Sequence, residues 1–153
     1  MKLKFDRPRP GETDTCESIL RSLQEWFEIE EAITSYRRDI ETMETYVARA
    51  NTGIVGFVTV QQHNDQSAEL HVMAVRKELH RTGIGRALVS HVEAELRKRQ
   101  VRLFQVKTLG PSRRSNSYEK TRLFYEALGF ISLEETTAIW GASNPCLIMV
   151  KHL

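Results

Sequence analysis

The chain has 153 residues, of which 41% are hydrophobic and 27% charged, as expected for a globular protein with one hydrophobic core. Its net charge of +2 does not favour a general nucleic-acid-binding protein, and its two cysteines, Cys16 and Cys146, are too few for a disulfide framework. No apolar run approaches the roughly 18 residues of a membrane span, and the start lacks the apolar stretch of a signal peptide. We therefore expect a single domain over residues 1–153, located in the reducing cytoplasm.

The first third of the sequence predicts a short strand and two helices. A strand over Lys2–Phe5 is followed by apolar residues at helical spacing, from Ile19 to Phe27, and by a charged helix over Ile29–Ile40. This third is acidic, with 8 Lys or Arg against 11 Asp or Glu in residues 1–50, whereas residues 51–153 carry 14 against 9. Such an asymmetry would suit a cationic acceptor and an anionic ligand, and ordinary scatter of surface charge is the simpler explanation.

The middle of the chain changes to a period of two, which predicts strands over Thr45–Arg49, Gly53–Gln62 and Ser67–Val75. Polar turns separate them, so the three strands should form an antiparallel meander. In the third strand, Glu69 and His71 lie on the polar face.

The rest of the chain predicts a helix, a strand, a second helix and two final strands, over Ile84–Arg99, Val101–Thr108, Glu119–Leu128, Phe130–Glu135 and Leu147–Lys151. Hairpins therefore come first and a strand-helix-strand crossover follows. This order predicts an α+β domain with a mixed sheet.

A glycine-containing turn joins the third strand of the meander to the next helix. The first amides of a helix lack internal partners and lie at the positive end of its dipole, so such a turn can bind a phosphate. There is no GxxxxGK[ST] motif and no GxGxxG followed by a distant acid, which excludes a P-loop and disfavours a dinucleotide fold. A tight turn that only packs the helix against the strand would have the same sequence pattern. The turn residues are His80, Arg81, Thr82, Gly83, Ile84, Gly85 and Arg86.

Two motifs together resemble the GNAT superfamily of acetyl-coenzyme A-dependent N-acetyltransferases. One is the strand ending in Ala74-Val75 with the following GxG turn, and the other is Leu123–Phe130, which is similar to the family's FYExxGF signature. The resemblance covers roughly residues 54–135. It implies a GNAT-like fold, in which a central, mixed, splayed β-sheet is flanked by about four helices.

The resemblance also implies roles for particular residues. The backbone of Met73, Ala74 and Val75 would pair with the pantetheine arm of acetyl-CoA like an added strand. The amides of Arg81, Thr82, Gly83, Ile84, Gly85 and Arg86 would hold the pyrophosphate, and the glycines would let it approach the backbone. Tyr125 would contact the cofactor near its sulfur and protonate the departing thiolate.

The chemistry of amine acetylation requires a proton acceptor, because only a neutral amine attacks a thioester. Glu69 falls where some members of the family place a carboxylate base, acting directly or through a water. His71, two residues later on the same face, could be the base instead or only a neighbour, and Glu69 could be a solvated strand residue. An amide near Met73 would hold the developing oxyanion. This chemistry needs no metal.

The chain departs from the family pattern at three positions. His80 replaces an Arg or Gln before the GxG turn, and Tyr118 and Thr121 stand where the family often has Asn and Ala. The contact that the family ascribes to this Asn is therefore not expected here.

The amine acceptor, a small molecule or a peptide, should lie under the first two helices. We expect Trp26, Glu28 and His71 to contact it, although Trp26 would also suit a packed core and Glu28 a solvated helix face. Neither nucleic acid nor membrane is expected as a partner, and the two last strands could pair across a homodimer. The alternative function is a non-catalytic acyl-CoA-binding or regulatory domain with the same fold.

Overall fold

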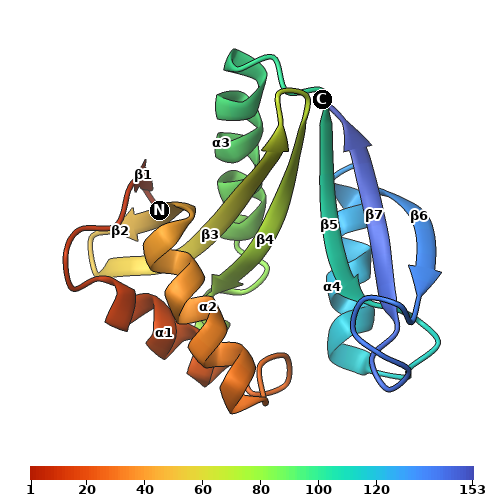
Figure 1. Ribbon diagram of the computed structural model, residues 1–153. Helices are drawn as coiled ribbons and strands as arrows, with labels where there is room; N and C mark the ends of the chain where they lie inside the picture. The colour runs from red at the N-terminus through yellow and green to blue at the C-terminus, as the bar shows by residue number, and fades with distance from the viewer.

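The computed structural model describes residues 1–153 and shows a seven-stranded sheet with helices on both faces (Figure 1). The strands are β1 (Lys4–Asp6), β2 (Glu44–Ala50), β3 (Gly53–Asn64), β4 (Ser67–Val75), β5 (Leu103–Leu109), β6 (Ile131–Thr136) and β7 (Cys146–His152). The helices are α1 (Thr13–Ser22), α2 (Glu30–Thr42), α3 (Ile84–Lys98) and α4 (Asn116–Ala127), with a short 3₁₀ turn at Lys77–Leu79. The predicted order of elements and the mixed sheet are confirmed.

The sheet has the strand order β1-β2-β3-β4-β5-β7-β6. All neighbouring strands are antiparallel except β4 and β5, which are parallel because α3 crosses between them. The final strand, β7, inserts between β5 and β6. The parallel contact of β4 with β5 therefore joins a half made of β1–β4 to a half made of β5–β7.

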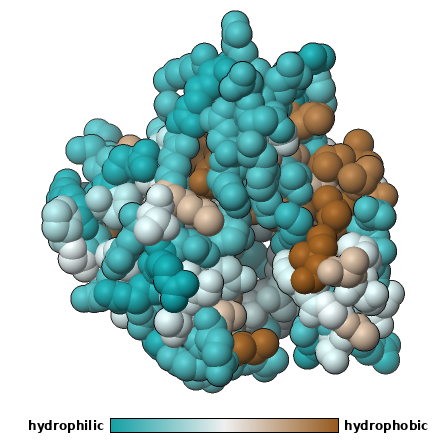
Figure 2. All heavy atoms as spheres, in the orientation of Figure 1, coloured by the Kyte–Doolittle hydropathy of each residue, from teal (hydrophilic) through white to brown (hydrophobic).

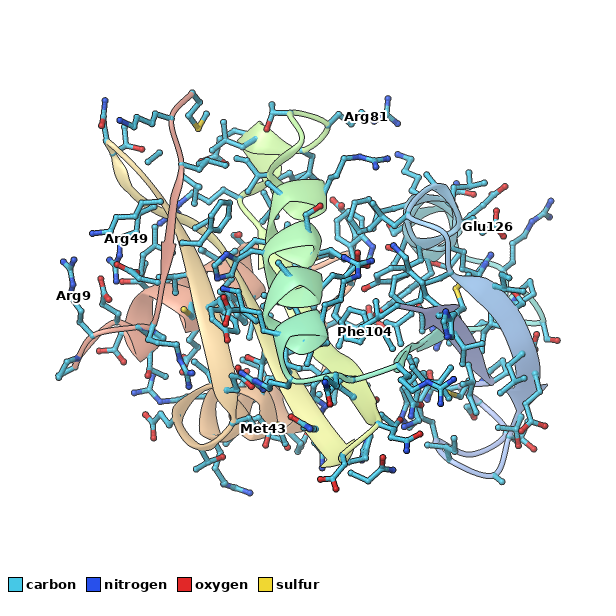
Figure 3. The ribbon with its side chains drawn as sticks, turned by 90° about the horizontal axis from the view of Figure 1, so that it is seen from above. Arg9, Met43, Arg49, Arg81, Phe104 and Glu126 are labelled. Carbon is cyan, nitrogen blue, oxygen red and sulfur yellow. The ribbon has the colours of Figure 1, made fainter.

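Each face of the first half has its own hydrophobic core. The apolar residues of α3 recur at steps of four, and this periodicity places Ile84, Leu88, Val92 and Leu96 in one buried cluster with Phe104. Phe104 comes from β5, and Figure 3 shows it between α3 and the last two strands of the sheet. On the opposite face, residues of α1 and α2 pack against Phe57, Val72 and other residues of β2–β4. Helix α3 on one face and helices α1 and α2 on the other thus enclose β4 from both sides.

The second half of the sheet has no helix over the face that corresponds to α1 and α2. Ile131 and Leu133 of β6 are 70% and 63% exposed, and Figure 2 shows hydrophobic residues on this side of the molecule. The pairing of the last strands across a homodimer stays a prediction. As for membranes, every helix of the chain is too short or too polar to cross a bilayer.

Candidate functional site

The candidate site is a slot between β4 and β5. The two strands pair only from Ser67 opposite Leu103 to Leu70 opposite Val106, and beyond these residues they part. Past the parting, β4 stays paired with β3 and β5 with β7, so each strand keeps one free edge. Figure 1 shows the strands diverging as a V, and Figure 2 shows the surface hollowed between the halves. The free N–H and C=O groups of these edges can pair with an extended, amide-containing ligand.

The turn before α3 lies at the β4 side of this slot. Gly83 caps the helix with φ +90° and Arg81 precedes it with φ +64°, so two left-handed residues bend the chain sharply. No side chain caps α3, which leaves its first amides available to an anion. Arg81 and Arg86 are exposed, and Figure 3 shows Arg81 pointing outward from the turn. The predicted phosphate-binding residues are thus brought together in a geometry suited to an anion.

The two glycines of the turn serve different purposes. A Cβ on Gly83 would meet nothing within 4 Å, so Gly83 is required by its backbone conformation alone. A Cβ on Gly85 would lie 3.1 Å from Cζ of Phe124. The expectation that both glycines only admit a phosphate was incomplete, because Gly85 also lets α3 approach α4 closely.

Tyr125 lies in α4, where its ring packs against Phe124 and Phe130 and is only 6% exposed. Burial, with smaller contributions from the hydroxyls of Tyr118 and Tyr36, raises the pKa of the Tyr125 phenol far above its ordinary value. The hydroxyl has no hydrogen-bond partner in the chain. It is not sealed from solvent either, because Thr108 Oγ1 is the one sealed side-chain polar atom that lacks a partner. The phenol is therefore a buried, protonated donor whose hydroxyl makes no hydrogen bond within the chain.

Thr108 provides a separate argument that the slot binds a polar ligand. This residue is 4% exposed and lies on β5, two positions beyond the last pairing with β4. A buried hydroxyl without a partner costs free energy, and a polar ligand in the slot would satisfy it. The chain therefore fits acetyl-CoA at three places: the open strand edges, the turn before α3 and this hydroxyl. The sequence pattern alone gave no reason to select Thr108.

Glu69 is buried on β4, within the stretch that still pairs with β5. Its Oε1 accepts hydrogen bonds from His63 Nε2 at 2.8 Å and from Lys107 Nζ at 3.0 Å. Its role as the proton acceptor stays a prediction. Lys107 and His63 were not among the predicted site residues, because their contact with Glu69 depends on how the strands are paired.

His71 lies two residues further along β4, at a bulge where Leu70 pairs with Val60 and Val72 with Thr59. Its Nε2 is 2.7 Å from Oδ2 of Asp39, and its ring meets the ring of Tyr36 edge to face at 5.8 Å. Both partners come from α2, which covers this face of β4. His71 was among the predicted site residues, and neither Asp39 nor Tyr36 was.

Trp26 links the loop between α1 and α2 to α4 and to the turn. Its Nε1 donates to Thr121 Oγ1 at 2.9 Å, and Tyr118 donates its hydroxyl to the Trp26 carbonyl at 2.8 Å. The Trp26 ring also meets His80 edge to face, while Nε2 of His80 lies 2.8 Å from the Val75 carbonyl. The three departures from the family pattern, His80, Tyr118 and Thr121, therefore all contact Trp26.

Glu28, the other predicted acceptor residue, is exposed in the same loop. Its carboxylate lies 4.0 Å from Arg113, which also donates to Asn144 at 2.5 Å. Arg113 thus lies between the loop before α2, the loop before α4 and the hairpin of β6 and β7. No hydrogen bond or ion pair joins Trp26 or Glu28 to Glu69 or His71, so the polar contacts of the predicted acceptor residues form two separate groups.

Comparison with known proteins places the chain in a family. Residues 41–132 match the family model described as an acetyltransferase (GNAT) domain, and the chain belongs to this family. A comparison with curated proteins found no match.

Solved structures share the fold. A GNAT-family protein from Desulfovibrio desulfuricans has a TM-score of 0.86 and 20% identity over 99% of both chains. The PaiA N-acetyltransferase from Thermoplasma acidophilum in complex with coenzyme A has a TM-score of 0.78 and 18% identity over 100% of both chains. The ribosomal-protein-S18-alanine N-acetyltransferase from Escherichia coli has a TM-score of 0.77 and 21% identity, covering 99% of this chain and 94% of its own. The chain thus has an acetyltransferase fold whose structural neighbours include coenzyme A complexes.

Proposed function

We propose that this protein is an N-acetyltransferase that moves the acetyl group of acetyl-CoA to a primary amine by direct attack. The observation that carries the proposal is the position of a protonated phenol, Tyr125, in a fold whose parted strands and helix turn suit acetyl-CoA. A domain that only binds acyl-CoA would not need a proton donor buried in this way.

Different residues of the chain would bind different parts of acetyl-CoA. The first amides of α3, with Arg81 and Arg86 nearby, would bind the pyrophosphate. The free edge of β4 at Met73, Ala74 and Val75 would pair with the pantetheine amides, and an amide near Met73 would hold the oxyanion that develops on the thioester carbonyl.

Proton transfers complete the reaction. The amine nitrogen forms a bond to the carbonyl carbon and gives up a proton to a base on the face of β4 that carries Glu69 and His71. The bond between carbon and sulfur breaks, and Tyr125 donates its proton to the departing sulfur. Tyr125 then recovers a proton from solvent, so the enzyme returns to its starting state without a covalent intermediate.

An assay of thiol release from acetyl-CoA over a panel of amines tests the proposal. The panel should contain polyamines, aminoglycosides, amino acids and peptides with free N-termini, and calorimetry should measure coenzyme A binding in parallel. We expect binding and release of thiol with at least one amine. Binding without thiol release for every amine would favour the regulatory alternative, and absence of binding would refute both.

A further inference from the structure

The pair formed by His71 and Asp39 has the arrangement of a base with its orienting carboxylate. Asp39 Oδ2 lies 2.7 Å from His71 Nε2. A carboxylate only accepts hydrogen bonds, so Nε2 carries the proton in this contact. In the neutral imidazole, Nδ1 is then the unprotonated nitrogen, and its lone pair is free to accept a proton.

Nδ1 of His71 is also accessible. It makes no hydrogen bond within the chain, and the one sealed polar side-chain atom that lacks a partner is Thr108 Oγ1. Nδ1 therefore keeps contact with solvent. The ring cannot turn freely, because Tyr36 packs against it and Asp39 holds its other nitrogen. Tyr36 and Asp39 are three residues apart and so lie on one face of α2.

The backbone places His71 at the point where the slot opens. Leu70 is the last residue of β4 that pairs with β5, and His71 is the first beyond it. The bulge at His71 breaks the regular alternation of β4 at this position. Met73, whose neighbouring amide would hold the oxyanion, follows two residues later. His71 thus lies between the closed and the open parts of the sheet.

Glu69 differs from His71 in both position and contacts. It lies opposite Gln105 within the paired stretch, and it is 5% exposed. Its Oε1 is already bound by Lys107 and His63. The ammonium of Lys107 compensates the buried negative charge, so Glu69 has the contacts of a structural ion pair that joins β4 to β5.

From these contacts we infer that His71 is the general base of the acetyl transfer and that Asp39 is its positioning residue. The inference rests on the proposed function. As the bond between the amine and the carbonyl carbon forms, Nδ1 of His71 takes the proton that the nitrogen loses, and Asp39 stabilises the resulting imidazolium. The imidazolium returns this proton to solvent when the products leave. One proton is released overall for each ammonium that is acetylated.

Steady-state kinetics of the protein, with acetyl-CoA and the best amine of the panel, test the inference. His71→Gln should lower kcat by about 100-fold, the low end of what general bases contribute, and change the KM for acetyl-CoA by less than about 2-fold. Imidazole added to His71→Ala should restore part of the lost kcat. His152→Gln, which changes an exposed histidine of β7, is the matched control and should retain full activity.

Variants of the carboxylates separate the two candidate bases. Asp39→Asn should lower kcat by about 10-fold with little change in KM, and Asp39→Glu should recover part of this loss. Glu69→Gln should lower the midpoint of thermal unfolding, whereas its effect on kcat should be small. Coenzyme A binding by calorimetry confirms that each variant is folded.

The outcomes are distinguishable. If the wild type releases no thiol with any amine, the proposed function fails. If the wild type is active and His71→Gln keeps more than a third of its kcat, or imidazole restores nothing to His71→Ala, the inference alone is overturned. Loss of all activity in folded Glu69→Gln, with His71→Gln active, would return the role of base to Glu69.

Discussion

Trp26 and Thr121 are 95 residues apart in the chain and are joined by a hydrogen bond of 2.9 Å between indole Nε1 and Oγ1. This bond attaches the loop between α1 and α2 to α4. Thr121 stands at a position where the family often has alanine, which has no side-chain acceptor. Thr121 therefore supplies the side-chain acceptor that this bond requires.

A double-mutant cycle should detect the bond between these two residues. Trp26→Phe and Thr121→Val should each lower the free energy of unfolding by about 1 kcal/mol, and the double variant should cost less than their sum by roughly 0.5–1 kcal/mol. Urea unfolding provides the measurement. Trp140→Phe, which changes a partly exposed tryptophan in the last hairpin, is the control. Strictly additive losses would show that the bond contributes nothing to stability.

Tyr125→Phe should lower kcat by about 100-fold and leave the affinity for coenzyme A unchanged. The phenylalanine keeps the ring contacts with Phe124 and Phe130 and removes only the proton donor. Because the pKa of Tyr125 is raised above its ordinary value of 10.0, the phenol should stay protonated, and activity should not fall through its ionisation between pH 7 and 10. Thiol release and calorimetry check both points. Tyr46→Phe, on β2, should behave as the wild type, and equal kcat values for the two variants would contradict the assigned role.

The two glycines of the turn should respond differently to substitution. Gly83→Ala forces a Cβ into the left-handed region and should cost about 1–2 kcal/mol, whereas Gly83→Asn should cost less because Asn tolerates this region. Gly85→Ala should destabilise the protein through contact with Phe124, and a second change, Phe124→Leu, should relieve part of the loss. Thermal unfolding measures all four variants. If Phe124→Leu gave no relief, the close approach of α3 to α4 would not explain the requirement for Gly85.

Acid should destabilise the protein through Glu12. Arg49 donates to both carboxylate oxygens of Glu12, at 2.5 and 2.6 Å, and this contact lowers the pKa of Glu12 from 4.5 to about 2. Between these values the unfolded state binds a proton that the folded state does not, so stability falls as the pH drops from 4.5 toward 2. Glu12→Gln lacks this ionisation, so its stability should depend less steeply on pH in this range.

Urea unfolding at several pH values between 5 and 3 measures this difference. Glu134→Gln, at an exposed glutamate of β6, should retain the steep dependence of the wild type. If the free energy of unfolding depended equally steeply on pH in the wild type and in Glu12→Gln, the contact with Arg49 would not contribute to the acid sensitivity of the protein.

Much of the fold was predictable because its signals are local. The alternation of β4 and the four-residue spacing of α3 gave both elements, and the bounds of β4 were predicted without error. The start of α4 was placed three residues too late, although Ser115 accepts a hydrogen bond from the Tyr118 amide and caps the helix. This signal was present in the sequence and was missed. The insertion of β7 between β5 and β6 could not be predicted, because no local sequence pattern indicates the order of strands in the sheet.

The site was predictable only where it follows a motif. The turn before α3 and Tyr125 belong to contiguous stretches whose residues stay together in any fold. Asp39 and His71 are separated by 32 residues and meet because α2 packs over the bulge of β4. Contacts of this kind depend on the tertiary arrangement, which the spacing of residues along one chain does not encode.

The parting of β4 and β5 also has a consequence for the free protein. Two strand edges face each other in the middle of the sheet, and exposed edges of this kind are sites at which chains associate and aggregate. A ligand that pairs with the edge of β4 satisfies its amides and occupies the space that a foreign strand would need. A bound acetyl-CoA would thereby cover the free edge of β4, and the amides of this edge should exchange with solvent more slowly in the bound protein than in the free protein.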